Sequence, residues 1–304
     1  MSDRFPWQVD SGARDSCLYG RLRVLYAAGL VVAVLALVAW WFIESRSDVS
    51  PGHSGPMPRA VLRLREIEVR RSGTWVLPTG LRWEAGRIVA DSDGAELAHV
   101  PGGDVELSNR TGGGHRVSVK SLYVDRHEVT VLQFKAFCRA KGAKMPPQPI
   151  GSSLQYPMVN VTWQLAVEYG EWAGRRLPTE AEWQRAACGD DQRVYPWGNV
   201  DRPSCRNGPG NGDGWAGLAP VGTFPDGASP FGCVDMAGNA WEWCADSAPP
   251  EGGGAGGIGF VYRVLKGGSA LWEEPLYLRS SSRAALVSFN VQGKGMGFRL
   301  VRDE

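Results

Sequence analysis

Residues 175–183 read RRLPTEAEW, and this stretch carries the clearest folding signal in the chain. Within it, Thr179 is followed three residues later by Glu182, a capping box that places a helix N-terminus at Thr179. Trp183 and Ala186 follow at the spacing of one helix face, which predicts that both point inward. The stretch therefore predicts an amphipathic helix that docks on an aromatic core.

Two further helix starts lie upstream of this stretch. Thr130 and Gln133 form a second capping box, and apolar residues follow it at helical spacing (Val131, Phe134, Phe137 and Cys138). Thr162 opens another helix with one apolar face (Leu165, Ala166, Tyr169 and Trp172), and Gly174 suits its C-terminal exit. From residue 94 onward the rest reads as short β-like runs separated by Gly, Pro, Asn and Asp.

The composition narrows the classes of function. The 304 residues include 40 glycines and 13 tryptophans, which indicates a loop-rich fold pinned by buried rings. Lys and Arg number 33 against 32 Asp and Glu, so the charge balance does not indicate nucleic-acid binding. The six cysteines include no C-x-x-C pair, which disfavours a zinc ribbon or a thioredoxin-like site.

Residues 24–43 (VLYAAGLVVAVLALVAWWFI) hold no charged side chain over twenty positions, enough for a helix to cross a bilayer. The run ends in Trp40 and Trp41 without a small-x-small site, which favours an uncleaved signal anchor over a signal peptide. Arg21 and Arg23 place residues 1–23 in the cytoplasm. We therefore expect a single-pass protein of the cell (inner) membrane whose large domain is periplasmic or extracellular.

Residues 44–93 read as a Ser/Pro/Gly-rich linker and then a short β-rich collar. The pattern leaves open whether residues 60–93 form a separate module or part of the main domain.

Two clusters of oxygen-bearing residues have spacing that suits calcium, which takes six to eight oxygens including backbone carbonyls. The first cluster is Asp235, Gly238, Ala240 and Glu242. The second cluster is Asn207, Gly208, Asp213 and Trp215. The alternative role for the Asn and Asp side chains is to hold turns through hydrogen bonds to the backbone.

Taken together, these segments resemble the formylglycine-generating enzyme (sulfatase-modifying factor) family over residues 94–304. The resemblance rests on RRLPTEAEW, on GNAWEW at 238–243 and on GFRL at 297–300, in that order, with RVLKGGS at 263–269 between them. It implies an α+β domain related to C-type lectins, with little regular secondary structure. It also implies structural calcium at both clusters, with Asp235 standing where asparagine is common.

The chain departs from the family at the catalytic position. The family's oxidases bind copper through two cysteines after the Gly-Gly-Ser motif, and these positions fall at Trp272 and Tyr277. Ser269 is retained, but no cysteine follows Cys244. Copper(I) prefers soft thiolates, so the sequence argues against copper-dependent oxidation of a substrate cysteine.

Two narrower relatives leave weaker alternatives. The ergothioneine-pathway sulfoxide synthases pair a similar domain with a histidine-rich iron site, but here only His115, His127 and Glu128 offer candidate ligands. The retroelement-diversified variable proteins share the GGS to GFRL frame, and the sequence does not separate them from ordinary family members.

Five cysteines lie in the expected outer domain: Cys138, Cys188, Cys205, Cys233 and Cys244. An oxidising compartment predicts disulfides among them, with at least one left over, and buried free thiols are the alternative.

The sequence thus predicts a membrane-anchored, calcium-stabilised domain that binds a peptide, protein or glycan ligand outside the cytoplasm, or serves as a scaffold. We expect a pseudoenzyme with a ligand surface at Trp272, Tyr277, Phe289 and Asn290, although each of these residues also suits packing. The alternative function is an oxidoreductase of the formylglycine-generating type with altered metal chemistry.

Overall fold

The computed structural model describes residues 77–108, 114–210, 212–248, 261–272, 274–287 and 295–304. The predicted tail (1–23), membrane span (24–43) and the linker up to residue 76 lie outside the described residues. Within the described ranges, every helix is too short or too polar to span a bilayer.

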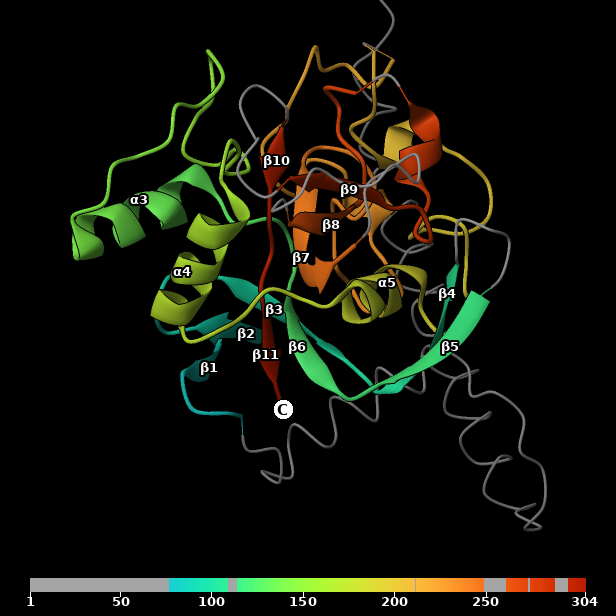
Figure 1. The fold of residues 1–304 in the computed structure, drawn as a ribbon, viewed down its shortest axis with the longest axis horizontal. Coiled ribbons are helices and arrows are strands. Elements are labelled where there is room, and N and C mark those ends of the chain that lie inside the picture. The colour runs from blue at the N-terminus through green and yellow to red at the C-terminus, as the bar shows by residue number, and fades with distance from the viewer. Residues whose placement is uncertain (1–76, 109–113, 211, 249–260, 273, 288–294) are drawn as a thin grey trace, which may run out of the picture. The chain divides into compact units, whose positions relative to one another are not determined.

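Three short sheets form the framework (Figure 1). The first is antiparallel, with the order β1-β2-β3-β6-β11: Leu81–Glu84, Arg87–Ala90, Glu96–Val100, Leu122–Asp125 and Val301–Asp303. The second has the order β10-β7-β8-β9: Met296–Gly297, Trp241–Ser247, Tyr262–Lys266 and Ala284–Val287. The third is a two-stranded ribbon of β4 (Gly103–Ser108) and β5 (Gly114–Val119).

Strands β1 and β2 come from the segment that the sequence assigned to the collar. β2 pairs antiparallel with β3 through Ile88 opposite Leu97, and β3 pairs with β6. The five-stranded sheet therefore begins before residue 94.

The three helices start where the sequence predicts. They are α3 (Val131–Lys141), α4 (Trp163–Ala173) and α5 (Glu180–Cys188). Thr130 and Thr179 each complete a capping box, and the Thr162 side chain accepts a hydrogen bond from the Leu165 amide. Gly174 ends α4 in the left-handed conformation, with φ of 68°. Three single-turn 3-10 helices, η1 (Pro203–Cys205), η2 (Pro225–Gly227) and η3 (Pro275–Leu278), lie in the connecting loops.

Two hydrophobic clusters hold these elements together. In Figure 1, α3 and α4 lie on one side, where stacked rings of Phe134 and Tyr169 join them 5.4 Å apart. On the other side α5 packs against the β4–β5 ribbon, with Trp183 fully buried. The fold is therefore α+β with little regular secondary structure, as expected.

Candidate functional site

Three buried carboxylates lie close enough to influence one another electrostatically, and we call Glu128, Asp235 and Glu242 the acidic centre. Glu128 precedes α3, Asp235 lies in the loop before β7, and Glu242 lies within β7. Glu128 and Glu242 are fully buried and Asp235 is 7% exposed. Charges this deep need a counter-charge or a shifted pKa.

Arg299 supplies one counter-charge to this centre. Its Nε donates to Glu242 Oε2 at 2.6 Å and its Nη2 to Oε1 at 2.7 Å. Trp183 Nε1 also donates to Glu242 Oε2, at 2.6 Å. Both oxygens of Glu242 thus accept hydrogen bonds, and the Arg299 guanidinium neutralises the negative charge of Glu242.

The other two carboxylates have much weaker compensation. Glu128 Oε1 accepts a long 3.4 Å bond from the Ala240 amide, and its Oε2 has no partner among the described residues. Asp235 accepts from the Gly222 amide at 2.6 Å. Burial, then the charges of Asp235 and Glu242, raise the pKa of Glu128, and burial raises the pKa of Asp235 to about 6. A proton shared between Glu128 and Asp235, or a bound cation, would relieve this excess of negative charge.

Of the predicted ligands around Asp235, the structure places the carboxylates of Asp235 and Glu242 near each other and near Glu128. Glu242 faces Arg299, whereas Glu128 presents the unpaired oxygen. No three His, Cys, Asp or Glu side chains in the described ranges converge on one point, so a cation here needs backbone carbonyls such as those of Gly238 and Ala240. Sequence reasoning did not assign Glu128 to calcium, because Glu128 stands in the polar stretch DRHEVT (125–130), which gives no sign that its side chain is buried.

The second cluster forms a hydrogen-bonded turn. Asp213 Oδ2 accepts from the Gly208 amide at 2.8 Å, and its Oδ1 accepts from the Trp215 amide at 2.9 Å. The Asn207 carbonyl accepts from the Asn239 amide at 2.7 Å. The four residues are gathered, but both oxygens of Asp213 are used by amides, which is the turn-holding alternative that the sequence left open.

At the positions that the family resemblance assigns to copper ligands, the structure places two aromatic rings. Trp272 lies 5.7 Å from the buried Trp241 and Tyr277 lies 5.1 Å from it, both measured between ring centroids and both edge to face. The Ser269 hydroxyl donates to the Asn239 carbonyl at 3.0 Å and accepts from the Leu271 amide at 3.2 Å. These side chains offer no soft ligand, so the residues present do not fit a copper(I) site.

The predicted ligand surface is only partly described. Trp272 and Tyr277 are half-buried, and their neighbours Leu271 and Leu276 are 42% and 57% exposed. Phe289 and Asn290 lie outside the described residues. The candidate iron ligands are not gathered either, since no metal cluster of three such side chains occurs in the described ranges and His115 is exposed.

The expectation of disulfides is wrong for the cysteines of the described domain. All five are free and buried: Cys138, Cys188, Cys205, Cys233 and Cys244. Burial raises the pKa of the Cys188 and Cys233 thiols to about 11, which makes both thiols unreactive at neutral pH.

Comparison with known proteins shows which proteins this chain resembles. The chain is 42% identical over 159 residues to a formylglycine-generating enzyme of Thermomonospora curvata, covering 42% of this chain and 50% of the relative. It is 31% identical over 227 residues to a formylglycine-generating enzyme of Mycobacterium tuberculosis, covering 51% of this chain and 75% of the relative. It is 40% identical over 144 residues to the "Inactive C-alpha-formylglycine-generating enzyme 2" of Mus musculus, covering 44% of each chain. The matched part of the chain therefore spans half or less of two of these three relatives.

A solved structure shows the same fold. PvdO from Pseudomonas aeruginosa superimposes with a TM-score of 0.60 at 23% identity, covering 76% of this chain and all of PvdO. The family model described as "Sulfatase-modifying factor enzyme 1-like domain" matches residues 72–304. The chain therefore belongs to the sulfatase-modifying factor enzyme 1-like family.

Proposed function

We propose that this protein is a non-catalytic member of the family, a membrane-anchored domain that binds a peptide, protein or glycan partner outside the cytoplasm or serves as a scaffold. The observation that carries the proposal is the packing of Trp272 and Tyr277 on Trp241 at the positions of the copper ligands. Indole and phenol rings do not replace thiolates as copper(I) ligands. The name of the mouse relative, an inactive enzyme, supports the same role.

The retained Ser269 does not restore a reaction centre. Ser269 is 2% exposed, and its hydroxyl bridges the Asn239 carbonyl and the Leu271 amide. Attack by a serine requires an adjacent base, and the groups that contact this hydroxyl are main-chain ones. The exposed Leu271 and Leu276 next to the two rings add apolar surface that a partner could cover.

An aldehyde assay tests the loss of catalysis. We expect the full chain in nanodiscs, supplied with copper(I) and oxygen, to form no aldehyde from a cysteine-containing peptide above the protein-free rate. The aldehyde is trapped with a hydrazine, and the product is quantified by mass spectrometry. The M. tuberculosis relative serves as the positive control, and multiple turnovers by this protein would refute the proposal.

We also propose that the acidic centre holds a structural calcium ion. Glu128 and Asp235 would supply carboxylate oxygens, and carbonyls of the Gly238–Ala240 turn would complete the shell. The ion would order the loop between η2 and β7 and take no part in chemistry. Three carboxylates against the single Arg299 support the proposal.

Calcium removal is expected to lower the melting temperature of the wild-type protein. Ligand present at about 100 times its Kd adds about 2.7 kcal/mol to stability, which corresponds to about 5–10 °C for a domain of this size. Differential scanning fluorimetry with calcium or with EGTA measures the shift. Glu128→Gln should abolish the calcium-dependent shift and Asp213→Asn should keep it. The reverse pattern would place calcium in the second cluster.

A further inference from the structure

The two outer edges of the β4–β5 ribbon differ in how their backbone groups are satisfied. On β4, the Glu106 amide donates to Gln192 Oε1 at 3.3 Å, and Gln192 Nε2 donates to the Asp104 carbonyl at 3.1 Å. Gln184 Nε2 covers the Glu106 carbonyl at 2.8 Å. Side-chain amides thus take the place of a neighbouring strand and close this edge.

The register then shows which groups of β5 point to the other edge. Asp104 pairs with Ser118, and Glu106 pairs with Arg116. Because Asp104 and Glu106 direct their main-chain groups away from β5, both pairs are the non-hydrogen-bonded pairs of the ladder. The N–H and C=O groups of Arg116 and Ser118 therefore point away from β4. Within the described part of the chain, β5 pairs with β4 alone.

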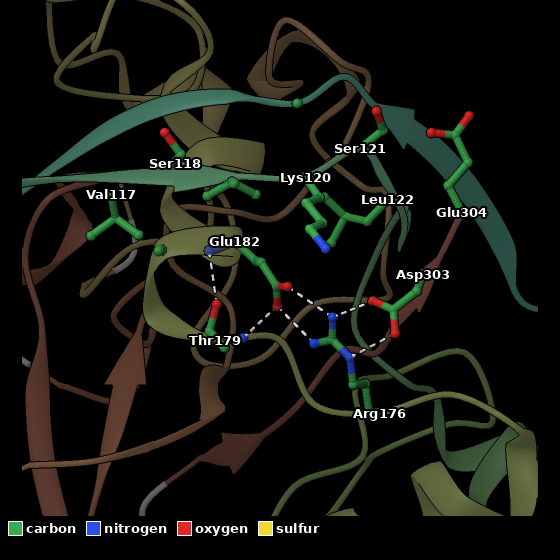
Figure 2. Close-up of a pocket in the computed structure, with 13 residues that line it drawn as sticks. Val117, Ser118, Lys120, Ser121, Leu122, Arg176, Thr179, Glu182, Asp303 and Glu304 are labelled. Atoms are coloured by element: carbon green, nitrogen blue, oxygen red, sulfur yellow. Dashed lines mark hydrogen bonds and ion pairs between the residues drawn. The ribbon is translucent and has the colours of Figure 1, made fainter.

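A hollow of about 920 Å³ lies beside this open edge (Figure 2). Its walls come from the end of β5, the β5–β6 turn, the start of α5 and the end of β11: Gly102, Val117, Ser118, Val119, Lys120, Ser121, Leu122, Arg176, Thr179, Ala181, Glu182, Asp303 and Glu304. Figure 2 shows Glu182, Arg176 and Asp303 linked into a chain of ion pairs across the hollow from Ser118. A strand added to β5 would place every second side chain over this hollow.

The charges in the hollow favour a basic side chain in the added strand. Arg176 is already shared between Glu182, at 2.7 Å, and Asp303. The remaining charged groups are Lys120 and Glu304, and Glu304 Oε1 lies 3.7 Å from His99 Nε2. With His99 neutral, the lining holds three carboxylates (Glu182, Asp303, Glu304) and two cations (Lys120, Arg176). This leaves one excess negative charge on the walls.

We propose that the open edge of β5 is a docking site for an extended peptide that carries lysine or arginine, which adds to the ribbon as a third strand. The main-chain groups of Arg116 and Ser118 give the affinity, and the hollow selects the basic side chain. This site is separate from the acidic centre and from the rings at Trp272 and Tyr277. The docking proposal can therefore be tested independently of the proposed non-catalytic role.

Proline at position 118 is the sharpest test. Ser118→Pro removes the outward N–H that docking needs, and proline is tolerated on an edge strand whose N–H faces solvent. Ser118→Ala is the matched control, because both variants lose the hydroxyl bond to Asp104 and only one loses the amide. The probe is a phage-displayed library of random eight-residue peptides, selected on the full chain in nanodiscs.

We expect the selected peptides to alternate β-branched residues with a basic residue, to bind Ser118→Ala within about twofold of wild type and to bind Ser118→Pro at least about tenfold more weakly. Equal binding to both variants, or a selection that enriches no peptide, would overturn the proposal. Should Ser118→Pro fail to fold, hydrogen exchange of wild type decides instead. The selected peptide must slow exchange at Arg116 and Ser118, and its backbone N-methylated analogue must not; no slowing, or equal slowing by both, refutes the docking mode.

Discussion

Replacement of Arg299 by methionine is expected to lower the free energy of unfolding by about 3–5 kcal/mol, since it removes one partner of a buried ion pair. Glu242 would lose the guanidinium that binds both of its oxygens. Arg299 also donates to the carbonyls of Asp125, Arg126 and Val234, so three main-chain carbonyls would lose a donor. The acidic centre would then hold three buried carboxylates without the arginine counter-charge.

Arg302→Met is the matched control for this substitution. Arg302 is an arginine of the neighbouring strand β11, and its exposed guanidinium donates to the carbonyls of Gly174 and Thr79. Urea unfolding of both variants in calcium and in EGTA separates the effects. Equal losses in the two variants would show that the Arg299–Glu242 pair is not a main support of the interior.

Replacement of Trp241 by alanine is expected to cost about 3–5 kcal/mol, the range for emptying a large buried aromatic site. Trp241 is fully buried, and the rings of Trp272 and Tyr277 both rest on it. The substitution should therefore also loosen the packing of Trp272 and Tyr277. Trp241 Nε1 has no hydrogen-bond partner among the described residues, so Trp241→Phe should retain most of the stability.

Trp83→Ala provides the control for tryptophan removal, because Trp83 is 39% exposed and lies on the outermost strand β1. Thermal unfolding followed by near-ultraviolet circular dichroism reports stability and ring packing together. The rank order expected is wild type, Trp241→Phe and then Trp241→Ala. A Trp241→Ala protein as stable as Trp83→Ala would mean that the aromatic packing at the copper positions contributes little.

The helices could be predicted because their signals are local. Thr130 with Gln133, and Thr179 with Glu182, mark helix starts within four residues of sequence, and both capping boxes form as expected. The α+β class and the positions of Trp272 and Tyr277 followed from the family resemblance. Capping signals between residues close in sequence were sufficient to place the helix starts. A long series of motifs in a fixed order was sufficient to predict the fold class.

The acidic centre could not be completed from sequence, because its partners are distant in the chain. Arg299 and Glu242 are 57 residues apart, and Glu128 lies 112 residues from the Ala240 amide that it accepts from. The closure of the β4 edge by Gln192 joins residues 86 apart. The free cysteines also follow from tertiary packing, which buries the thiols of the described domain without joining any two of them. Spacing along a chain gives no measure of such contacts.

A copper(I) titration tests the central claim most directly. The full chain in nanodiscs competes with bicinchoninate for copper(I) under reducing conditions, with the M. tuberculosis relative measured alongside. The packing of Trp272 and Tyr277 on Trp241 predicts that this protein leaves the chelator fully loaded. Stoichiometric removal of copper from the chelator by this protein would contradict the account and restore the oxidoreductase as the leading function.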